Sequence, residues 1–159
     1  MDLYLDYESP VGHLLLSCGE TGLTGIWMNR PPQGGGSPHP TLLQAAQWLD
    51  GYFAGKPAPI DFPLAPQGTP FQRLIWELLL EIPYGQSRTY GDLARQAACA
   101  LGRNRMSAQA VGGAVGRNPI SILIPCHRVL GSRGQLTGYA GGLDKKIWLL
   151  RHEGIAFLP

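Results

Sequence analysis

The chain has 159 residues, of which 44% are hydrophobic and 15% are charged, and its formal net charge is +2. This length suits one sizeable domain or two small ones, and the apolar content excludes a disordered chain. No apolar run is long enough to span a membrane, and the N-terminus lacks the pattern of a secretory signal. We therefore expect a cytoplasmic protein that makes no membrane contact.

Positive charge is distributed unevenly along the chain. Most of the arginines and lysines follow residue 87, where acidic residues are sparse. A basic C-terminal half favours an anionic partner such as nucleic acid, although an ordinary charged surface explains the same pattern equally well.

The cysteines Cys18, Cys99 and Cys126 form no CxxC pair, and their odd number argues against a disulfide framework. The four histidines show no spacing typical of zinc ligands. We expect reduced thiols and no metal. The default interpretation of each cysteine is a small buried hydrophobic residue.

The N-terminal part, residues 1–60, is predicted to be a small, structural α/β domain. Apolar segments at 3–5, 14–18 and 23–28 are separated by turns rich in glycine, which is typical of an antiparallel sheet. Residues 42–53 then show the apolar spacing of a helix.

A proline-rich linker at 61–68 precedes a mainly helical domain at 69–159. Thr69-Pro70 is a start signal for a helix that Pro83 and the following glycine end. Lys145 begins the last predicted helix, which runs to His152.

Two further short helices are expected in the middle of this domain. Thr89 is the predicted N-cap of a helix that begins at Tyr90, with Asp92 completing a capping box. Residues 107–115 form the next helix, and the pair suggests a helix-turn-helix. The predicted fold class is therefore α+β, with an antiparallel sheet domain followed by a helical domain that contains a helix-turn-helix.

The second of these helices consists almost entirely of Ala, Gly and Val between residues 108 and 116. Such residues have poor helix propensity or bury little side chain. Tight packing between helices explains them, and so does the close approach of a nucleic-acid backbone.

Cys126 is the strongest candidate for chemistry. A thiol reacts as its thiolate, which neighbouring cationic or hydrogen-bonding groups stabilise, and His127 and Arg128 follow it directly. Adjacent side chains of an extended segment point to opposite faces. Proton exchange between Cys126 and His127 therefore requires a turn or a bridging water. Alone, this dipeptide is equally compatible with a buried cysteine beside an incidental histidine.

The wider sequence around Cys126 is far more specific, and it resembles the O6-alkylguanine-DNA alkyltransferase family. The likeness covers essentially all of residues 69–154 and, more loosely, Ser9-Pro10-Val11-Gly12. Its motifs are TPFQ at 69–72 with Trp76, IPYG at 82–85, TYGDLA at 89–94, VGGA at 111–114, NPI at 118–120, PCHRV at 125–129, TGYAGG at 137–142 and WLLRHEG at 148–154.

The resemblance implies irreversible, single-turnover transfer of an alkyl group from O6-alkylguanine in duplex DNA to Cys126, without a cofactor, in a DNA-repair reaction. It leaves open whether O4-alkylthymine is also a substrate. His127 matches the general base that acts through water, and Glu153 matches the carboxylate that orients it. Asn118 matches a residue that buttresses the active-site turn. Tyr90 matches the proton donor to N3 of the guanine.

The resemblance also implies a base pocket and a DNA surface. Tyr139 matches a residue that forms a wall of the base pocket, with Gly141 close by. The backbone N–H of Ala140 matches a donor to O6 of the guanine. The Val129 carbonyl matches an acceptor for its exocyclic amine. A monomer is expected to bind in the minor groove and flip the nucleotide out of the duplex. The predicted DNA-contacting residues are Ala108, Gln109, Gly112, Gly113, Arg117 and Arg128.

Gln109 departs from the family pattern. Much of the family has an arginine there, which enters the base stack where the nucleotide has left. Glutamine brings no charge and fewer donors, so we expect weaker or altered flipping. The loop before it carries Arg103 and Arg105, which either contact phosphates or are simply exposed.

The sequence leaves three alternative functions to consider. A lesion sensor would bind the alkylated base without repairing it, but that group typically has tryptophan at the position of Cys126. A helix-turn-helix protein without alkyl transfer would make the cysteine, histidine and glutamate incidental. A Cys–His hydrolase lacks any supporting signature around Cys126.

Overall fold

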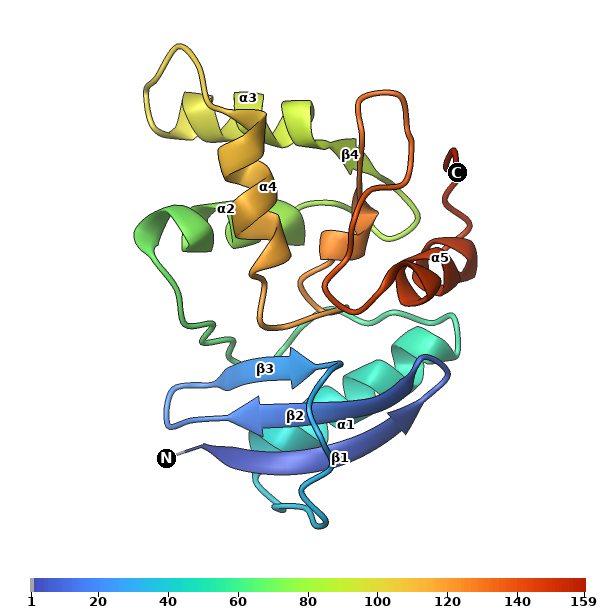
Figure 1. Cartoon of the computed structure of the whole chain (residues 1–159). Coiled ribbons are helices and arrows are strands. Elements are labelled where there is room, and N and C mark those ends of the chain that lie inside the picture. Colours follow the sequence, from blue (N-terminus) through green and yellow to red (C-terminus); the bar gives the residue numbers. More distant parts are fainter. Residues whose placement is uncertain (1) are drawn as a thin grey trace. The chain divides into compact units, whose positions relative to one another are not determined.

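The computed structural model describes residues 2–159, which form two compact units (Figure 1). The first unit contains the residues up to Gln67 together with Pro119–Ser121. The second contains Gly68–Asn118 and Ile122–Pro159. None of the helices formed by residues 2–159 combines the length and apolar character needed to cross a membrane.

The first unit is a three-stranded antiparallel sheet with one helix packed on it (Figure 1). Its strands are β1 (Leu3–Ser9), β2 (Gly12–Cys18) and β3 (Leu23–Trp27), in the order β1-β2-β3. The helix α1 (Pro40–Phe53) contacts all three strands. The central strand buries Leu14, Leu15 and Leu16, so its apolar run forms the core of this unit.

Two segments from elsewhere in the chain pair with β3. Leu23 N–H donates to the Pro63 carbonyl at 2.9 Å, and Ile26 N–H donates to the Pro119 carbonyl at 3.0 Å. Ile26 also forms a parallel bridge with Ile120. The backbone of β3 is therefore covered by pairing, which removes an edge that would otherwise be open to aggregation.

The second unit is mainly helical, as predicted. Its elements are α2 (Pro70–Leu80), β4 (Arg88–Thr89), α3 (Tyr90–Ala100), α4 (Ala108–Gly116), a 3₁₀ turn η1 (Cys126–Arg128), β5 (Val129–Leu130) and α5 (Leu143–His152). The helices α2, α3 and α4 pack against one another, and α3 and α4 form the helix-turn-helix. The short strands β4 and β5 pair in parallel, which brings the start of α3 beside the chain that follows Cys126. This arrangement confirms the predicted α+β fold class.

Local side-chain caps explain where the helices of the second unit begin. The Thr69 hydroxyl accepts from Gln72 N–H at 3.1 Å, and the Gln72 side chain accepts from Thr69 N–H at 2.9 Å. Thr89 and Asp92 form the same reciprocal pair, as the sequence predicts. The Ser107 hydroxyl accepts from Ala110 N–H at the start of α4.

Two helices start earlier than predicted. The structure begins α1 at Pro40 rather than at residue 42, because the His39 side chain accepts from Thr41 N–H and proline suits the first helical position. It begins α5 at Leu143 rather than at Lys145, directly after Gly142 in the left-handed region. Neither start carries the hydroxyl cap that marks the other helices.

The capping box of α2 supplies a direct test of this account. Replacing Thr69 with Ala should lower the free energy of unfolding by about 1 kcal/mol, because a helix N–H loses its acceptor. Thermal unfolding should show a midpoint lower by about 2–4 °C. Thr69→Ser keeps the hydroxyl and should stay close to wild type. Equal losses in the two variants would contradict the role of the cap.

Candidate active site

Cys126 lies at the end of a buried turn that follows α4. The turn contains Ile122 at φ 71°, the one non-glycine residue of the described chain with positive φ. The side-chain amide of Asn118 donates to the Ile124 carbonyl at 2.8 Å, and Cys126 N–H donates to the same carbonyl at 2.8 Å. A left-handed backbone is costly for a β-branched residue, so the surrounding contacts must hold it in place.

The Cys126 side chain is nearly enclosed, with 8% of the residue exposed. Burial raises the pKa of the Cys126 thiol above 9, while hydrogen bonds from Asn118 and Tyr139 and the charge of Lys146 lower it. Burial is the largest of these effects, so the thiol holds its proton at neutral pH. Attack by this sulfur therefore needs a neighbouring group that accepts the proton.

His127 is such a group. It is fully buried, and its Nε2 donates to the Glu153 carboxylate. Its other ring nitrogen, Nδ1, has no hydrogen-bond partner among residues 2–159. Burial lowers the pKa of His127 below 6.5, against an opposing effect of Glu153, so the ring is neutral at neutral pH. With the proton on Nε2, Nδ1 presents a free lone pair.

The 3₁₀ turn at Cys126–Arg128 resolves the geometric question raised by the sequence. In an extended chain, the side chains of residues 126 and 127 would point apart, whereas successive residues of a 3₁₀ turn are rotated by about a third of a turn. The local geometry thus no longer sends the two side chains to opposite faces.

Glu153 is the centre of a buried ionic network. Its Oε1 accepts from the Gly85 N–H at 3.0 Å and from Arg128 Nε at 2.7 Å, while its Oε2 accepts from His127. Arg128 Nη1 also donates to the Ile82 carbonyl at 2.7 Å. Both oxygens of the carboxylate are therefore occupied by donors from separate segments of the chain.

The prediction that Arg128 contacts DNA conflicts with this arrangement. Arg128 is 7% exposed, and its guanidinium is engaged by Glu153, the Ile82 carbonyl and the ring of Tyr84. An arginine enclosed beside a carboxylate has few donors left for a phosphate. The basic residue following His127 is part of the site's interior, and burial is not visible in the local sequence.

Tyr90 lies at the start of α3, and its hydroxyl is 2.9 Å from the Thr137 hydroxyl. Burial raises the pKa of Tyr90 above 10. Thr137 belongs to the loop between β5 and α5, which also carries the predicted pocket residues Tyr139, Ala140 and Gly141. The second unit thus contains every residue predicted for catalysis and for the base pocket.

Lys146 is a functional candidate that the sequence pattern did not reveal. It is fully buried on α5, and its Nζ donates to the Val129 carbonyl at 2.8 Å and to Thr137 Oγ1 at 3.1 Å. Burial lowers the pKa of Lys146 to about 8. One signal could have found it: Lys146 lies three and four residues before the buried Leu149 and Leu150, so it shares the apolar face of the helix.

Of the predicted DNA-contacting residues, Ala108, Gln109 and Gly113 are exposed on α4, and Arg117, which directly follows the helix, is exposed as well. A Cβ added at Gly113 would meet nothing within 4 Å, and one at Gly112 would make ordinary contact with the Tyr90 ring at 3.7 Å. Packing inside the second unit therefore does not require glycine at either position. This favours an external group close to the helix backbone over tight helix packing.

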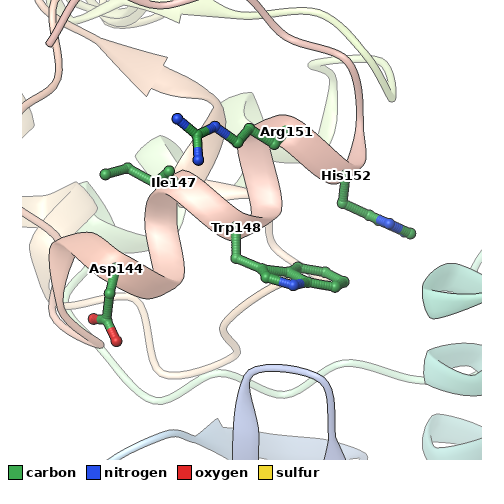
Figure 2. Close-up of a pocket in the computed structure, with 5 residues that line it drawn as sticks. All are labelled: Asp144, Ile147, Trp148, Arg151 and His152. Atoms are coloured by element: carbon green, nitrogen blue, oxygen red, sulfur yellow. The ribbon is translucent and has the colours of Figure 1, made fainter.

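A pocket on another face of α5 is separate from this cluster (Figure 2). It is lined by Asp144, Ile147, Trp148, Arg151 and His152. The rings of Trp148 and His152 are stacked with centroids 4.8 Å apart. None of the predicted site residues lines this pocket, so the thiol chemistry belongs elsewhere on the unit.

The fold and the site define a class of protein in which a helix-turn-helix unit carries a thiol beside a buried histidine–carboxylate pair. Residues 70–155 match the model of the 6-O-methylguanine DNA methyltransferase DNA-binding domain, and residues 3–66 match its ribonuclease-like domain. The chain belongs to the 6-O-methylguanine DNA methyltransferase family.

Individual relatives agree with this assignment. The chain is 43% identical to a methylated-DNA–protein-cysteine methyltransferase of Methanosarcina acetivorans, over 95% of this chain and 97% of that protein. It is 56% identical to one from Shigella flexneri over 67% of this chain and 60% of that protein. The crystal structure of Mycobacterium tuberculosis O6-methylguanine methyltransferase has a TM-score of 0.81 at 38% identity, covering 96% and 93% of the two chains.

A further crystal structure shows the Mycobacterium tuberculosis protein in complex with DNA. It is 40% identical to this chain, covers 94% of it and 91% of the other chain, and has a TM-score of 0.80.

Removing the charge of Glu153 tests the buried network. Glu153→Gln should lower the free energy of unfolding by about 3–5 kcal/mol, because it leaves the buried Arg128 without its counter-charge. Urea unfolding measures the loss. The exposed Glu77→Gln serves as a matched control and should change stability by no more than about 0.5 kcal/mol. Losses of equal size in the two variants would rule out the proposed pairing.

Proposed function

We propose that this protein repairs DNA by transferring the alkyl group of O6-alkylguanine in duplex DNA to the sulfur of Cys126. The observation that carries the proposal is the enclosed series Cys126–His127–Glu153, in which the carboxylate fixes the proton on Nε2 and leaves Nδ1 as an acceptor. Membership in the 6-O-methylguanine DNA methyltransferase family supports the substrate. O4-alkylthymine is a further candidate substrate.

In the proposed reaction, His127 Nδ1 accepts the thiol proton of Cys126 through a bridging water, and Glu153 stabilises the imidazolium that forms. The sulfur attacks the alkyl carbon. An S–C bond forms, the C–O6 bond breaks, and its electron pair remains on the guanine. Tyr90 donates a proton to N3 of the departing base, which neutralises the charge.

The product is a thioether, which neither water nor an ordinary protein group displaces readily. Each molecule therefore acts once, and the reaction requires no cofactor. The role of Asn118 is to hold the turn that presents the thiol, since its amide is bonded to the Ile124 carbonyl.

We assign DNA recognition to α4, from the minor groove, with the lesion flipped out of the duplex and the protein acting as a monomer. The exposed small residues support close approach of a backbone, and Arg117 supplies charge near it. Tyr139, Ala140, Gly141 and the Val129 carbonyl would surround the flipped base. Support for DNA as the partner comes from the DNA-bound relative.

We also assign both binding and transfer to residues 69–159. Residues 1–60 have a structural role, and residues 61–68 connect the two parts. All of the proposed catalytic groups lie in the second unit, which supports this division.

Intact-mass measurement tests the transfer. After incubation with a duplex containing O6-methylguanine, the protein should gain one methyl group per molecule and no more. Cys126→Ala should gain none, whereas Cys99→Ala, which changes an exposed thiol of α3, should react like wild type. Binding without any mass gain would favour a lesion sensor or a helix-turn-helix protein that lacks the chemistry.

The glutamine at position 109 supplies a second test. Gln109→Arg should tighten binding to lesion-containing duplex and speed transfer by about threefold to tenfold, because arginine adds a charge and further donors. Gln47→Arg places the same charge on an exposed position of α1 and is the control. Unchanged affinity and rate in Gln109→Arg would contradict a role for this residue in flipping.

A further inference from the structure

Lys146 is a charged group that the proposed reaction does not yet use. It is fully buried, and its polar contacts are two neutral oxygens, the Val129 carbonyl and Thr137 Oγ1. Within residues 2–159, no ion pair involves this lysine. An enclosed ammonium without a counter-charge is costly, and such groups occur where a site needs them.

Lys146 is connected to Tyr90 through a single hydroxyl. The Nζ of Lys146 donates to Thr137 Oγ1 at 3.1 Å, and Thr137 Oγ1 lies 2.9 Å from the Tyr90 hydroxyl. A threonine hydroxyl has one proton and two lone pairs. When it accepts from Nζ, its own proton is available for the Tyr90 oxygen, and the Tyr90 proton is then free to point toward a base.

We infer that Lys146 and Thr137 form a proton relay that reprotonates Tyr90 as Tyr90 protonates the departing guanine. The inference rests on the proposed function, in which Tyr90 is the donor to N3. Lys146 and Thr137 touch no substrate in this account, and they act through Tyr90 as positioning residues.

The protons balance through the relay. The Tyr90 O–H bond breaks as the N–H bond forms at N3 of the guanine anion. The oxygen of Tyr90 takes the proton of Thr137, and Thr137 takes one from the ammonium of Lys146, which ends neutral. The proton released by Cys126 resides on His127, so the site carries the same total charge before and after transfer.

The electrostatic surroundings favour this direction of transfer. The titratable groups near Lys146 are Cys126 and His127 of η1 and, beyond Thr137, Tyr90 of α3. Burial lowers the pKa of Lys146 to about 8 and raises the pKa of Tyr90 above 10, so a Tyr90 phenolate takes a proton from the ammonium downhill. The lysine is charged at neutral pH and loses its proton above about pH 8.

Single-turnover rates on duplex DNA containing O6-methylguanine provide the first part of the test. Lys146→Met and Thr137→Val should each slow transfer on the order of tenfold or more, within the range that general acid catalysis contributes. Thr137→Ser restores a hydroxyl and should recover most of the rate. Lys145→Met removes the neighbouring lysine of α5 and is the matched control, with the wild-type rate expected.

The second part uses readouts that a purely structural role would not change. A duplex whose O6-methylguanine carries an electron-withdrawing group at C8 releases a weaker base, which needs less protonation, so the defects of Lys146→Met and Thr137→Val should shrink on it. The wild-type transfer rate, corrected for the titration of Cys126, should also decrease as the pH rises above about 8. This decrease should be absent in Lys146→Met. Circular dichroism melting checks that each variant is folded, and Thr137→Val carries the test if Lys146→Met is not.

The outcomes distinguish a failure of the proton relay from a failure of the proposed function. If the wild-type protein transfers the methyl group, the relay is overturned when Lys146→Met and Thr137→Val slow transfer equally on both substrates. It is also overturned when neither variant slows transfer. In both cases the proposed function stays intact. Absence of transfer by the wild-type protein overturns both. A rate defect that shrinks on the better leaving group and is recovered by Thr137→Ser supports the relay.

Discussion

The carboxylate of Glu153 is the interaction on which the rest of the site depends. It gathers the Gly85 N–H, the Arg128 guanidinium and the His127 ring around a carboxylate whose side chain is fully buried. These donors come from the loop after α2 and from the turn of Cys126, while Glu153 itself follows α5. One carboxylate therefore joins three distant segments, neutralises a buried cation and sets the tautomer of the histidine.

Burial then determines how each titratable group near the thiol behaves. It keeps the His127 ring neutral, so that the ring can accept a proton, and it holds the proton on Cys126 until a base removes it. It also brings the pKa of Lys146 to about 8, close to the working range of a proton donor. The same burial therefore prepares a base on one side of the reaction and a proton source on the other.

The turn that presents Cys126 is constrained at both of its ends. Before it, Pro119 and Ile120 pair with β3 of the first unit, and Asn118 bonds the Ile124 carbonyl. After it, Val129 and Leu130 pair with β4, next to the start of α3 and Tyr90. The left-handed Ile122 between these anchors is held by pairing on either side rather than by its own preference.

The sequence by itself determined the features that depend on neighbouring residues. The Thr69-Pro70 start signal and the capping box at Thr89 marked the starts of α2 and α3, because both depend on residues no more than three positions apart. The family resemblance supplied the chemistry and the residues proposed to carry it. The sequence did not reveal the role of two buried cations. Arg128 was expected to contact DNA, and Lys146 was not recognised as part of the site. Their partners, Glu153, Val129 and Thr137, lie 9 to 25 positions away. Only the tertiary structure decided which charges are enclosed, because burial depends on long-range packing that no local pattern encodes.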